Sequence, residues 1–116
     1  MKRLIVFLSI ITSSIFVFAQ ETAKDVVTEK YKVEGNCKMC KKRIENAAFI
    51  KGVKRAEWDK ESHELTVTYK PSKTNAEAIL GSVAKVGYSS EKAEADKAAY
   101  NNLPACCQYK DHVCND

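Results

Sequence analysis

The sequence predicts an α+β domain in which a four-stranded antiparallel sheet carries two helices on one face, in the order β-α-β-β-α-β. Several short segments alternate apolar and polar residues, as half-buried strands do. Two other segments repeat apolar residues every three or four positions, as amphipathic helices do. Glycines stand where these helices should end.

The strands are predicted from alternation with a period of two residues. Residues 28–35, 53–59 and 64–69 each direct apolar side chains to one face and polar side chains to the other. Because a short polar turn separates the second and third segments, we expect them to pair as an antiparallel hairpin. A short fourth strand is predicted over residues 88–92.

The two helices are predicted from apolar residues at helical spacing and from their end signals. The first ends at Gly52, and the second ends at Gly87. Thr74 and Glu77 have the spacing of a capping box, which predicts Thr74 as the N-cap of the second helix. The resulting element order over residues 28–92 is the ferredoxin-like split βαβ arrangement.

The segments outside this domain have a different character. Residues 1–19 combine two basic residues with a 15-residue run that is apolar apart from Ser and Thr, which predicts a cleaved signal peptide. The run is shorter than the roughly 20 residues of a spanning helix. We therefore expect a periplasmic or secreted chain without stable membrane insertion. Residues 20–27 should be a flexible lead-in, and residues 93–116 should form a C-terminal extension that begins with a short helix.

Length, charge and cysteine count exclude several classes of protein. A chain of 116 residues has room for one domain, which excludes a large multi-domain enzyme. The formal net charge of +4 is too small to indicate a nucleic-acid partner. The five cysteines are an odd number, so they cannot all pair within one chain as a disulfide framework.

The clearest chemistry lies in the sequence Cys37-Lys38-Met39-Cys40. At the start of a predicted helix the two sulfurs can converge on one ion, and the positive helix end favours thiolates. Lys41 would help to offset the charge of the resulting complex. Soft thiolates select soft ions, so Cu(I) is the expected ion, with Hg(II) and Zn(II) as alternatives. The pair also fits a plain disulfide or a thiol–disulfide oxidoreductase in which Cys37 attacks and Cys40 resolves.

Four further candidate ligands lie close together near the C-terminus: Cys106, Cys107, His112 and Cys114. One interpretation is a second soft-metal site, or extra ligands that fold back over the first pair. The other interpretation is a disulfide between Cys114 and one of the two adjacent cysteines, because adjacent cysteines rarely bond each other. The sequence leaves both open.

Several of these features occur together in one order: VEGNCKMCKKRIENA at 33–47, Gly52-Val53, AEWD at 56–59, LTVTY at 65–69 and Gly87-Tyr88. In this order they resemble the heavy-metal-associated (HMA) domain family. That family includes copper chaperones, the metal-binding modules of copper-transporting ATPases and a periplasmic mercury-binding protein. The resemblance covers residues 28–92.

The resemblance implies that Cys37 and Cys40 are the metal ligands and that Tyr88 packs beside the metal loop and shields it. It implies a metal-binding protein or metallochaperone, not an enzyme, that passes Cu(I) by thiolate ligand exchange. The partner would be a metal-transporting membrane protein or another metal-binding domain. A mercury(II)-binding transport component is the nearest alternative, and the oxidoreductase is the alternative from another class. The sequence leaves the oligomeric state open.

Overall fold

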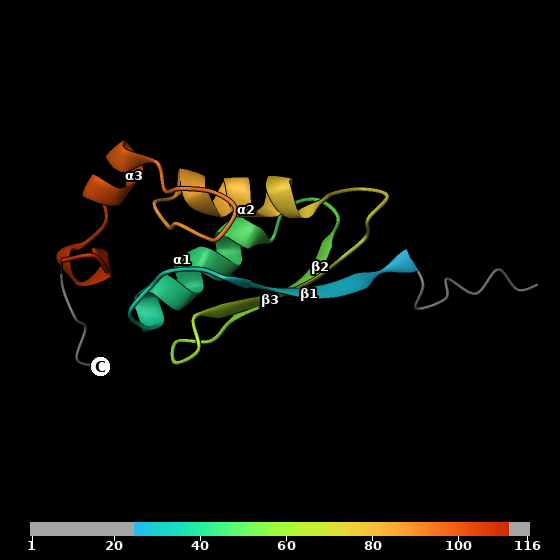
Figure 1. Ribbon diagram of the computed structural model, residues 1–116, viewed down its shortest axis with the longest axis horizontal. Helices are drawn as coiled ribbons and strands as arrows, with labels where there is room; N and C mark the ends of the chain where they lie inside the picture. Colours follow the sequence, from blue (N-terminus) through green and yellow to red (C-terminus); the bar gives the residue numbers. More distant parts are fainter. Residues whose placement is uncertain (1–24, 112–116) are drawn as a thin grey trace, which may run out of the picture.

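A three-stranded antiparallel sheet forms one layer of the computed structural model, which describes residues 25–111 (Figure 1). The strands are β1 (Val27–Lys32), β2 (Val53–Trp58) and β3 (Glu64–Tyr69), in the spatial order β1-β3-β2. The central strand β3 pairs with β2 as the predicted hairpin and with β1 on its other side. Three of the predicted strands are therefore confirmed, although β1 ends earlier than expected.

The fourth predicted strand, over residues 88–92, is not formed as a strand in the part of the chain that the structure describes. One isolated bridge joins Val33 to Ser90, and the Glu34 amide donates to the Ser89 carbonyl at 2.9 Å. The side chains of Ser89 and Ser90 accept hydrogen bonds from backbone amides of residues 93–95. These local bonds turn the chain back on itself and compete with extension of the ladder.

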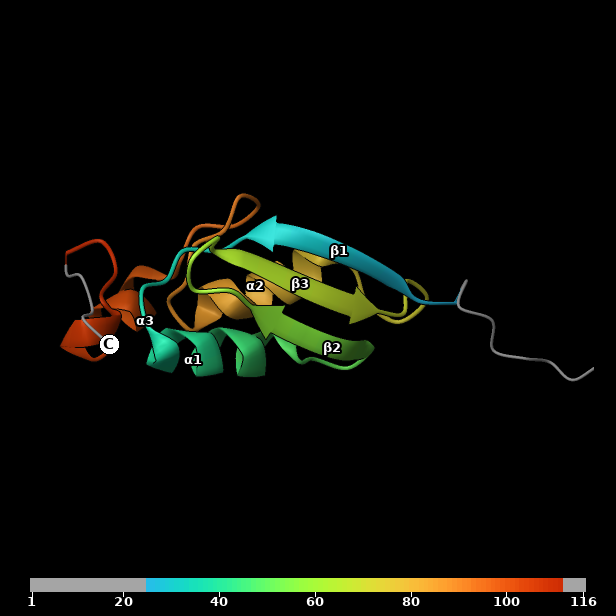
Figure 2. The same ribbon diagram turned by 90° about the horizontal axis from the view of Figure 1, so that it is seen from below.

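Both long helices lie on the same side of the sheet (Figure 2). They are α1 (Lys38–Ala48) and α2 (Ala76–Lys85). The N-cap of α2 is Asn75, whose side-chain oxygen accepts from the Ala78 amide at 2.8 Å. The predicted capping box at Thr74 is therefore wrong by one residue, because Thr74 is buried and the asparagine side chain takes the capping role.

Glycines with left-handed backbone follow both helices, in different ways. Gly87 has φ 102° and comes directly after Val86, the C-cap of α2, as expected. Gly52 has φ 98°, but α1 already ends at Ala48, so Gly52 forms the turn into β2 and not the helix end itself. In both places an L-residue with a side chain would be strained.

The core lies between the helices and the sheet, and it includes part of the C-terminal extension. Its largest fully buried apolar side chains are Trp58, Tyr88, Ile44, Leu65, Ile79, Leu80, Val33, Val67 and Val83. Leu103 and Cys107, which lie beyond the predicted domain, are buried in the same cluster. No helix of the described residues is long and apolar enough to cross a membrane.

The extension forms α3 (Lys97–Asn101) and a short 3₁₀ turn, η2 (Ala105–Cys107). Asp96 is the N-cap of α3, and its own amide donates to the Ala84 carbonyl near the end of α2 at 2.9 Å. A Cβ atom on Gly87 would lie only 3.0 Å from the Tyr100 nitrogen. The glycine thus allows α3 to pack closely against the end of α2.

The loop before α1 has no room for a side chain at Gly35. A Cβ atom there would lie 2.9 Å from Cζ2 of Trp58 and 3.1 Å from Cδ1 of Ile44. We expect Gly35→Ala to lower the free energy of unfolding by about 1–3 kcal/mol, because a closely packed core must shift to admit the methyl group. Urea unfolding of the metal-free protein, followed by Trp58 fluorescence, measures this change.

Gly81 provides the matched control, because it lies in α2 and a Cβ atom there would meet no heavy atom within 4 Å. We expect Gly81→Ala to raise the free energy of unfolding by about 0.5–1 kcal/mol, since alanine loses less backbone entropy in a helix. Equal effects of the two substitutions would contradict the close packing around Gly35.

Candidate metal centre

The two cysteines of the CxxC sequence lie at the start of α1. Cys37 is the N-cap residue, with φ −154° and ψ 174°, and Cys40 lies in the first helical turn. The Lys41 amide donates to the Cys37 carbonyl at 3.0 Å, which begins the helix. Both sulfurs are therefore close to the helix end where backbone amides and the helix dipole favour negative charge.

A third cysteine joins this pair. The Cys37 sulfur lies 3.4 Å from the Cys40 sulfur and 3.9 Å from the Cys107 sulfur, and all three sulfurs lie within 4.8 Å of one another. The three side chains are buried, and no disulfide joins the cysteines of residues 25–111. Both views place the turn that follows α3 beside the N-terminal end of α1, and Figure 1 shows α3 itself beyond the end of α2 (Figures 1 and 2).

The other candidate ligands of the extension lie elsewhere. Cys106 is exposed, and its sulfur is 4.0 Å from that of Cys107 but outside the group of three. His112 and Cys114 lie outside the described residues, so the predicted disulfide with Cys114 stays a prediction. Of the two interpretations of the tail, the geometry at Cys107 matches extra ligands that fold back over the first pair.

The closeness of the three thiols limits how many of them can be ionised at the same time. Burial is the main reason why the pKa of the Cys107 thiol is raised, and the neighbouring Cys40 and Cys37 raise it further. This thiol is therefore protonated when no cation is bound. Two unit charges 4 Å apart repel by about 4 kcal/mol at an effective dielectric constant of 20. The sulfurs can therefore all become thiolates only when a cation binds among them and displaces their protons.

Tyr88 contributes a buried hydroxyl group to the same region. Its side chain is fully buried, and the hydroxyl has no hydrogen-bond partner among the described residues. Burial, and then the nearby sulfurs of Cys40 and Cys107, raises the pKa of Tyr88 far above its usual value. A buried donor without an acceptor is costly, and a thiolate beside it would supply the acceptor. The donor set thus fits a site that holds thiolates around a cation.

Asn36 is a contact of the site that the sequence reasoning missed. The Cys40 thiol donates to its side-chain oxygen at 3.1 Å. In the sequence, the only sign of this role is that Asn36 directly precedes Cys37 in a turn. The tail residue Tyr109 was also missed, although an aromatic residue two positions after Cys107 is a reasonable anchor for a docked segment.

Lys41, predicted to support the charge of the metal loop, is engaged elsewhere. Its ammonium group lies 2.6 Å from a carboxylate oxygen of Glu45 and donates to the Trp58 carbonyl at 3.0 Å. The same Glu45 oxygen accepts from the Trp58 amide at 2.8 Å. Lys41 therefore joins α1 to the end of β2, and it supports the site by fixing the helix.

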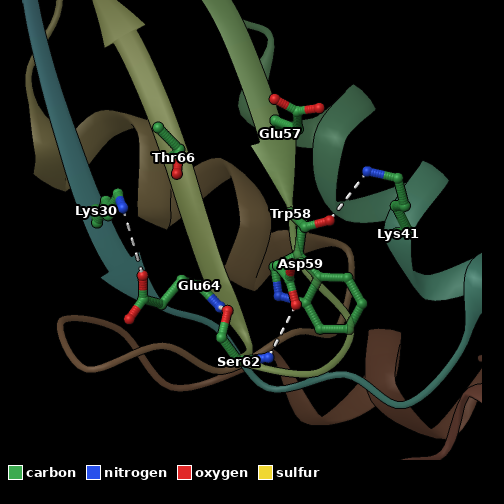
Figure 3. A pocket seen from close by; sticks show the side chains of 8 residues that line it. All are labelled: Lys30, Lys41, Glu57, Trp58, Asp59, Ser62, Glu64 and Thr66. Carbon is green, nitrogen blue, oxygen red and sulfur yellow. Dashed lines mark hydrogen bonds and ion pairs between the residues drawn. The ribbon is translucent and has the colours of Figure 1, made fainter.

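A pocket of about 250 Å³ lies beside this junction (Figure 3). It is lined by Lys30, Lys41, Glu57, Trp58, Asp59, Ser62, Glu64 and Thr66, and it contains no cysteine. Its polar groups pair with each other, as in the ion pair of Lys30 with Glu64 at 4.0 Å. Hydrogen bonds from the backbone amides of Ser62 and Glu61 lower the pKa of Asp59. The pocket thus offers no soft ligand, and the three thiols remain the candidate centre.

Comparison with known proteins gives the family of this chain. The family described as Heavy-metal-associated domain matches residues 30–89. The copper-exporting P-type ATPases of two Staphylococcus epidermidis strains are 30% identical over 86 residues, which is 71% of this chain and 11% of theirs. The chain thus spans about a tenth of the length of these curated relatives.

Solved structures agree with this assignment. A structure named CopZ metallochaperone has 30% sequence identity and a TM-score of 0.53, and the match covers 55% of this chain and 98% of that chain. A solution structure from Bacillus anthracis strain Ames has 22% identity and a TM-score of 0.54 over 57% and 96% of the two chains, which shows the fold alone. The family match covers more than half of the sequence and includes Cys37, Cys40 and Tyr88, and it confirms the predicted resemblance. This chain belongs to the heavy-metal-associated domain family.

Proposed function

We propose that this protein binds Cu(I) through Cys37 and Cys40 and passes the ion to a partner by exchange of thiolate ligands. The observation that carries the proposal is the buried convergence of the two sulfurs, 3.4 Å apart, at the N-terminus of α1 in an HMA family member. The matched relatives are a copper-exporting ATPase and a metallochaperone, which favours copper over mercury or zinc.

Ligand exchange requires only the thiolates of this site and one thiolate of the partner. A thiolate of the partner attacks the bound Cu(I), and the ion passes through a state with one more sulfur ligand before an original sulfur leaves. Only metal–sulfur bonds form and break, so the protein is a carrier and not an enzyme. The positive end of α1 offsets the single net negative charge of Cu(I) with two thiolates. The receiving partner is a metal-transporting membrane protein or another metal-binding domain.

Removal of either ligand tests the proposal directly. We expect Cys37→Ser and Cys40→Ser each to abolish tight binding of Cu(I), because a serine hydroxyl is not a soft ligand. The measurement is an anaerobic titration of the reduced protein with Cu(I) against the competing chelator bathocuproine disulfonate. Titrations with Hg(II) and Zn(II) rank the two alternative ions.

His63→Asn is the matched control, because His63 is exposed in the β2–β3 turn and asparagine tolerates its φ of 59°. It should bind Cu(I) as the unchanged protein does, which excludes surface binding of the ion by His63. If the unchanged protein binds Cu(I) weakly and reduces insulin rapidly, the oxidoreductase alternative is correct and the carrier proposal is wrong.

The hydroxyl of Tyr88 should stabilise the metal-bound site. We expect Tyr88→Phe to leave the free energy of unfolding of the metal-free protein unchanged or higher, because the removed group has no partner there. The same change should weaken Cu(I) binding by about 10- to 100-fold, as the loss of an outer-shell partner typically does. Urea unfolding and the competition titration provide the two readouts.

Tyr31→Phe is the control for this substitution, because the Tyr31 hydroxyl donates to Glu29 on β1 and not to the thiols. Its Cu(I) affinity should equal that of the unchanged protein. Unchanged affinity in Tyr88→Phe would show that the Tyr88 hydroxyl does not support the thiolates.

We further propose that the protein acts outside the cytoplasm after cleavage of residues 1–19. The support is the basic start and apolar run of that segment. N-terminal sequencing of the protein from the cells that produce it should find Gln20 as the first residue. A chain that retains Met1 would contradict export by cleavage.

A further inference from the structure

We propose that Cys107 is a third ligand of the bound ion and that residues 104–109, called the cap below, hold the ion until a partner displaces them. This inference rests on the proposed function above, because it adds a ligand and a release step to the same site. Cys107 lies outside the residues that match the HMA family. The third ligand is therefore a feature of this chain's extension.

The spacing of the sulfurs fits three ligands around one ion. Three sulfurs bonded at about 2.3 Å in one plane lie about 4.0 Å apart, whereas two sulfurs on opposite sides of an ion lie about 4.6 Å apart. The Cys37 sulfur lies 3.4 Å from the Cys40 sulfur and 3.9 Å from the Cys107 sulfur. These two distances are closer to the triangular arrangement, and the third, between the Cys40 and Cys107 sulfurs, is no longer than 4.8 Å. A closed zinc site takes four ligands, so three thiolates suit Cu(I) better.

Contacts that do not involve the thiol of Cys107 hold the cap in place. The Tyr109 hydroxyl accepts from the Ser89 amide and donates to the Gly87 carbonyl, both at 3.0 Å. Its ring stacks on that of Tyr88, with the ring centroids 5.7 Å apart, and contacts Tyr100 edge-on. Tyr88, which lies near the thiols, therefore also contacts the cap through the ring of Tyr109.

The backbone of the cap directs Cys107 inward. Leu103, just before the cap, is 6% exposed and belongs to the core. The Cys107 amide donates to the Pro104 carbonyl at 2.8 Å, which closes the 3₁₀ turn. In this turn Cys107 is fully buried whereas its neighbour Cys106 is exposed. The conformation of this turn therefore places Cys107, and not Cys106, in the site.

The cap also closes the site to a partner. With the cap in place Cys37 is 2% exposed, and Cys40 and Cys107 are fully buried. A partner's thiolate cannot attack an ion among these sulfurs until the cap moves. The only regular element in the cap is a three-residue 3₁₀ turn, so its local opening costs less than global unfolding. Transfer therefore begins when the bond between the ion and the Cys107 sulfur breaks, the released thiolate takes up a proton from water, and the cap moves away.

The experiment compares Cys107→Ser with Cys106→Ser, which changes the same atom one residue away and outside the group of three. X-ray absorption at the copper edge of the Cu(I)-loaded protein counts the sulfur ligands. We expect three in the unchanged protein and in Cys106→Ser, and two in Cys107→Ser. Cu(I) affinity in the chelator competition should fall at least about tenfold in Cys107→Ser alone, because even an outer-shell partner is worth about 10- to 100-fold.

Release kinetics test the role of the cap. The rate at which excess bathocuproine disulfonate removes Cu(I) should rise at least about tenfold in Cys107→Ser and stay unchanged in Cys106→Ser. Tyr109→Phe removes the two hydrogen bonds that the Tyr109 hydroxyl makes to Ser89 and Gly87 and keeps every thiol. It should release Cu(I) faster than the unchanged protein while three sulfurs remain bound. This variant tests the cap even if a buried serine at position 107 prevents folding.

Two results would overturn the inference and leave the proposed function intact. These are two sulfur ligands in the unchanged protein, or equal affinity and release rate in Cys107→Ser and Cys106→Ser while Cys37→Ser abolishes binding. Weak Cu(I) binding by the unchanged protein would instead overturn the proposed function itself, and the third ligand with it.

Discussion

The burial of three thiols within 4.8 Å of one another is the constraint on which the rest of this structure depends. Sulfurs in such a place are stable as neutral thiols, or as thiolates that share a cation, but not as separate anions. The adjoining polar groups fit the second state. The end of α1 favours negative charge, and the Tyr88 hydroxyl has no acceptor among the described residues until a thiolate provides one.

The sheet and α1 position the thiols through a small number of tight contacts. Trp58 donates its ring N–H to the Val33 carbonyl at 3.0 Å and fills the space beside Gly35. The pair of Lys41 and Glu45 attaches the first turns of α1 to the last residue of β2. The helix end that carries the cysteines is thereby fixed against the end of β2, which in turn is bonded to Val33, the residue after β1. A rigid support of this kind keeps the ligands of a metal site in position.

The extension changes what this domain can do. The HMA match ends at residue 89, yet the core continues into Leu103 and Cys107. A domain with two thiolates alone would present them to any partner, whereas this chain covers them with a segment of its own. The same aromatic residue, Tyr88, contacts both the thiols and the cap through its stack with Tyr109. If Cys107 is a third ligand, as proposed, retention and release of an ion are coupled to the docking of one short segment.

The sequence by itself determined the features that depend on local pattern. Alternation and helical periodicity predicted β2, β3 and both long helices, because these patterns reflect which face of each element is buried. The CxxC spacing placed Cys37 and Cys40 at one helix end, since both lie within one turn. Only the tertiary structure decided that residues 88–92 do not form a fourth strand at the edge of the sheet. It alone also decided that Cys107 joins Cys37 and Cys40. Side chains of Ser89 and Ser90 bond the local backbone and replace the predicted strand, which alternation cannot reveal. Cys107, and not Cys106, reaches Cys37 across 70 positions of the chain because Tyr109 docks on Tyr88, and spacing along a sequence carries no information about such a contact.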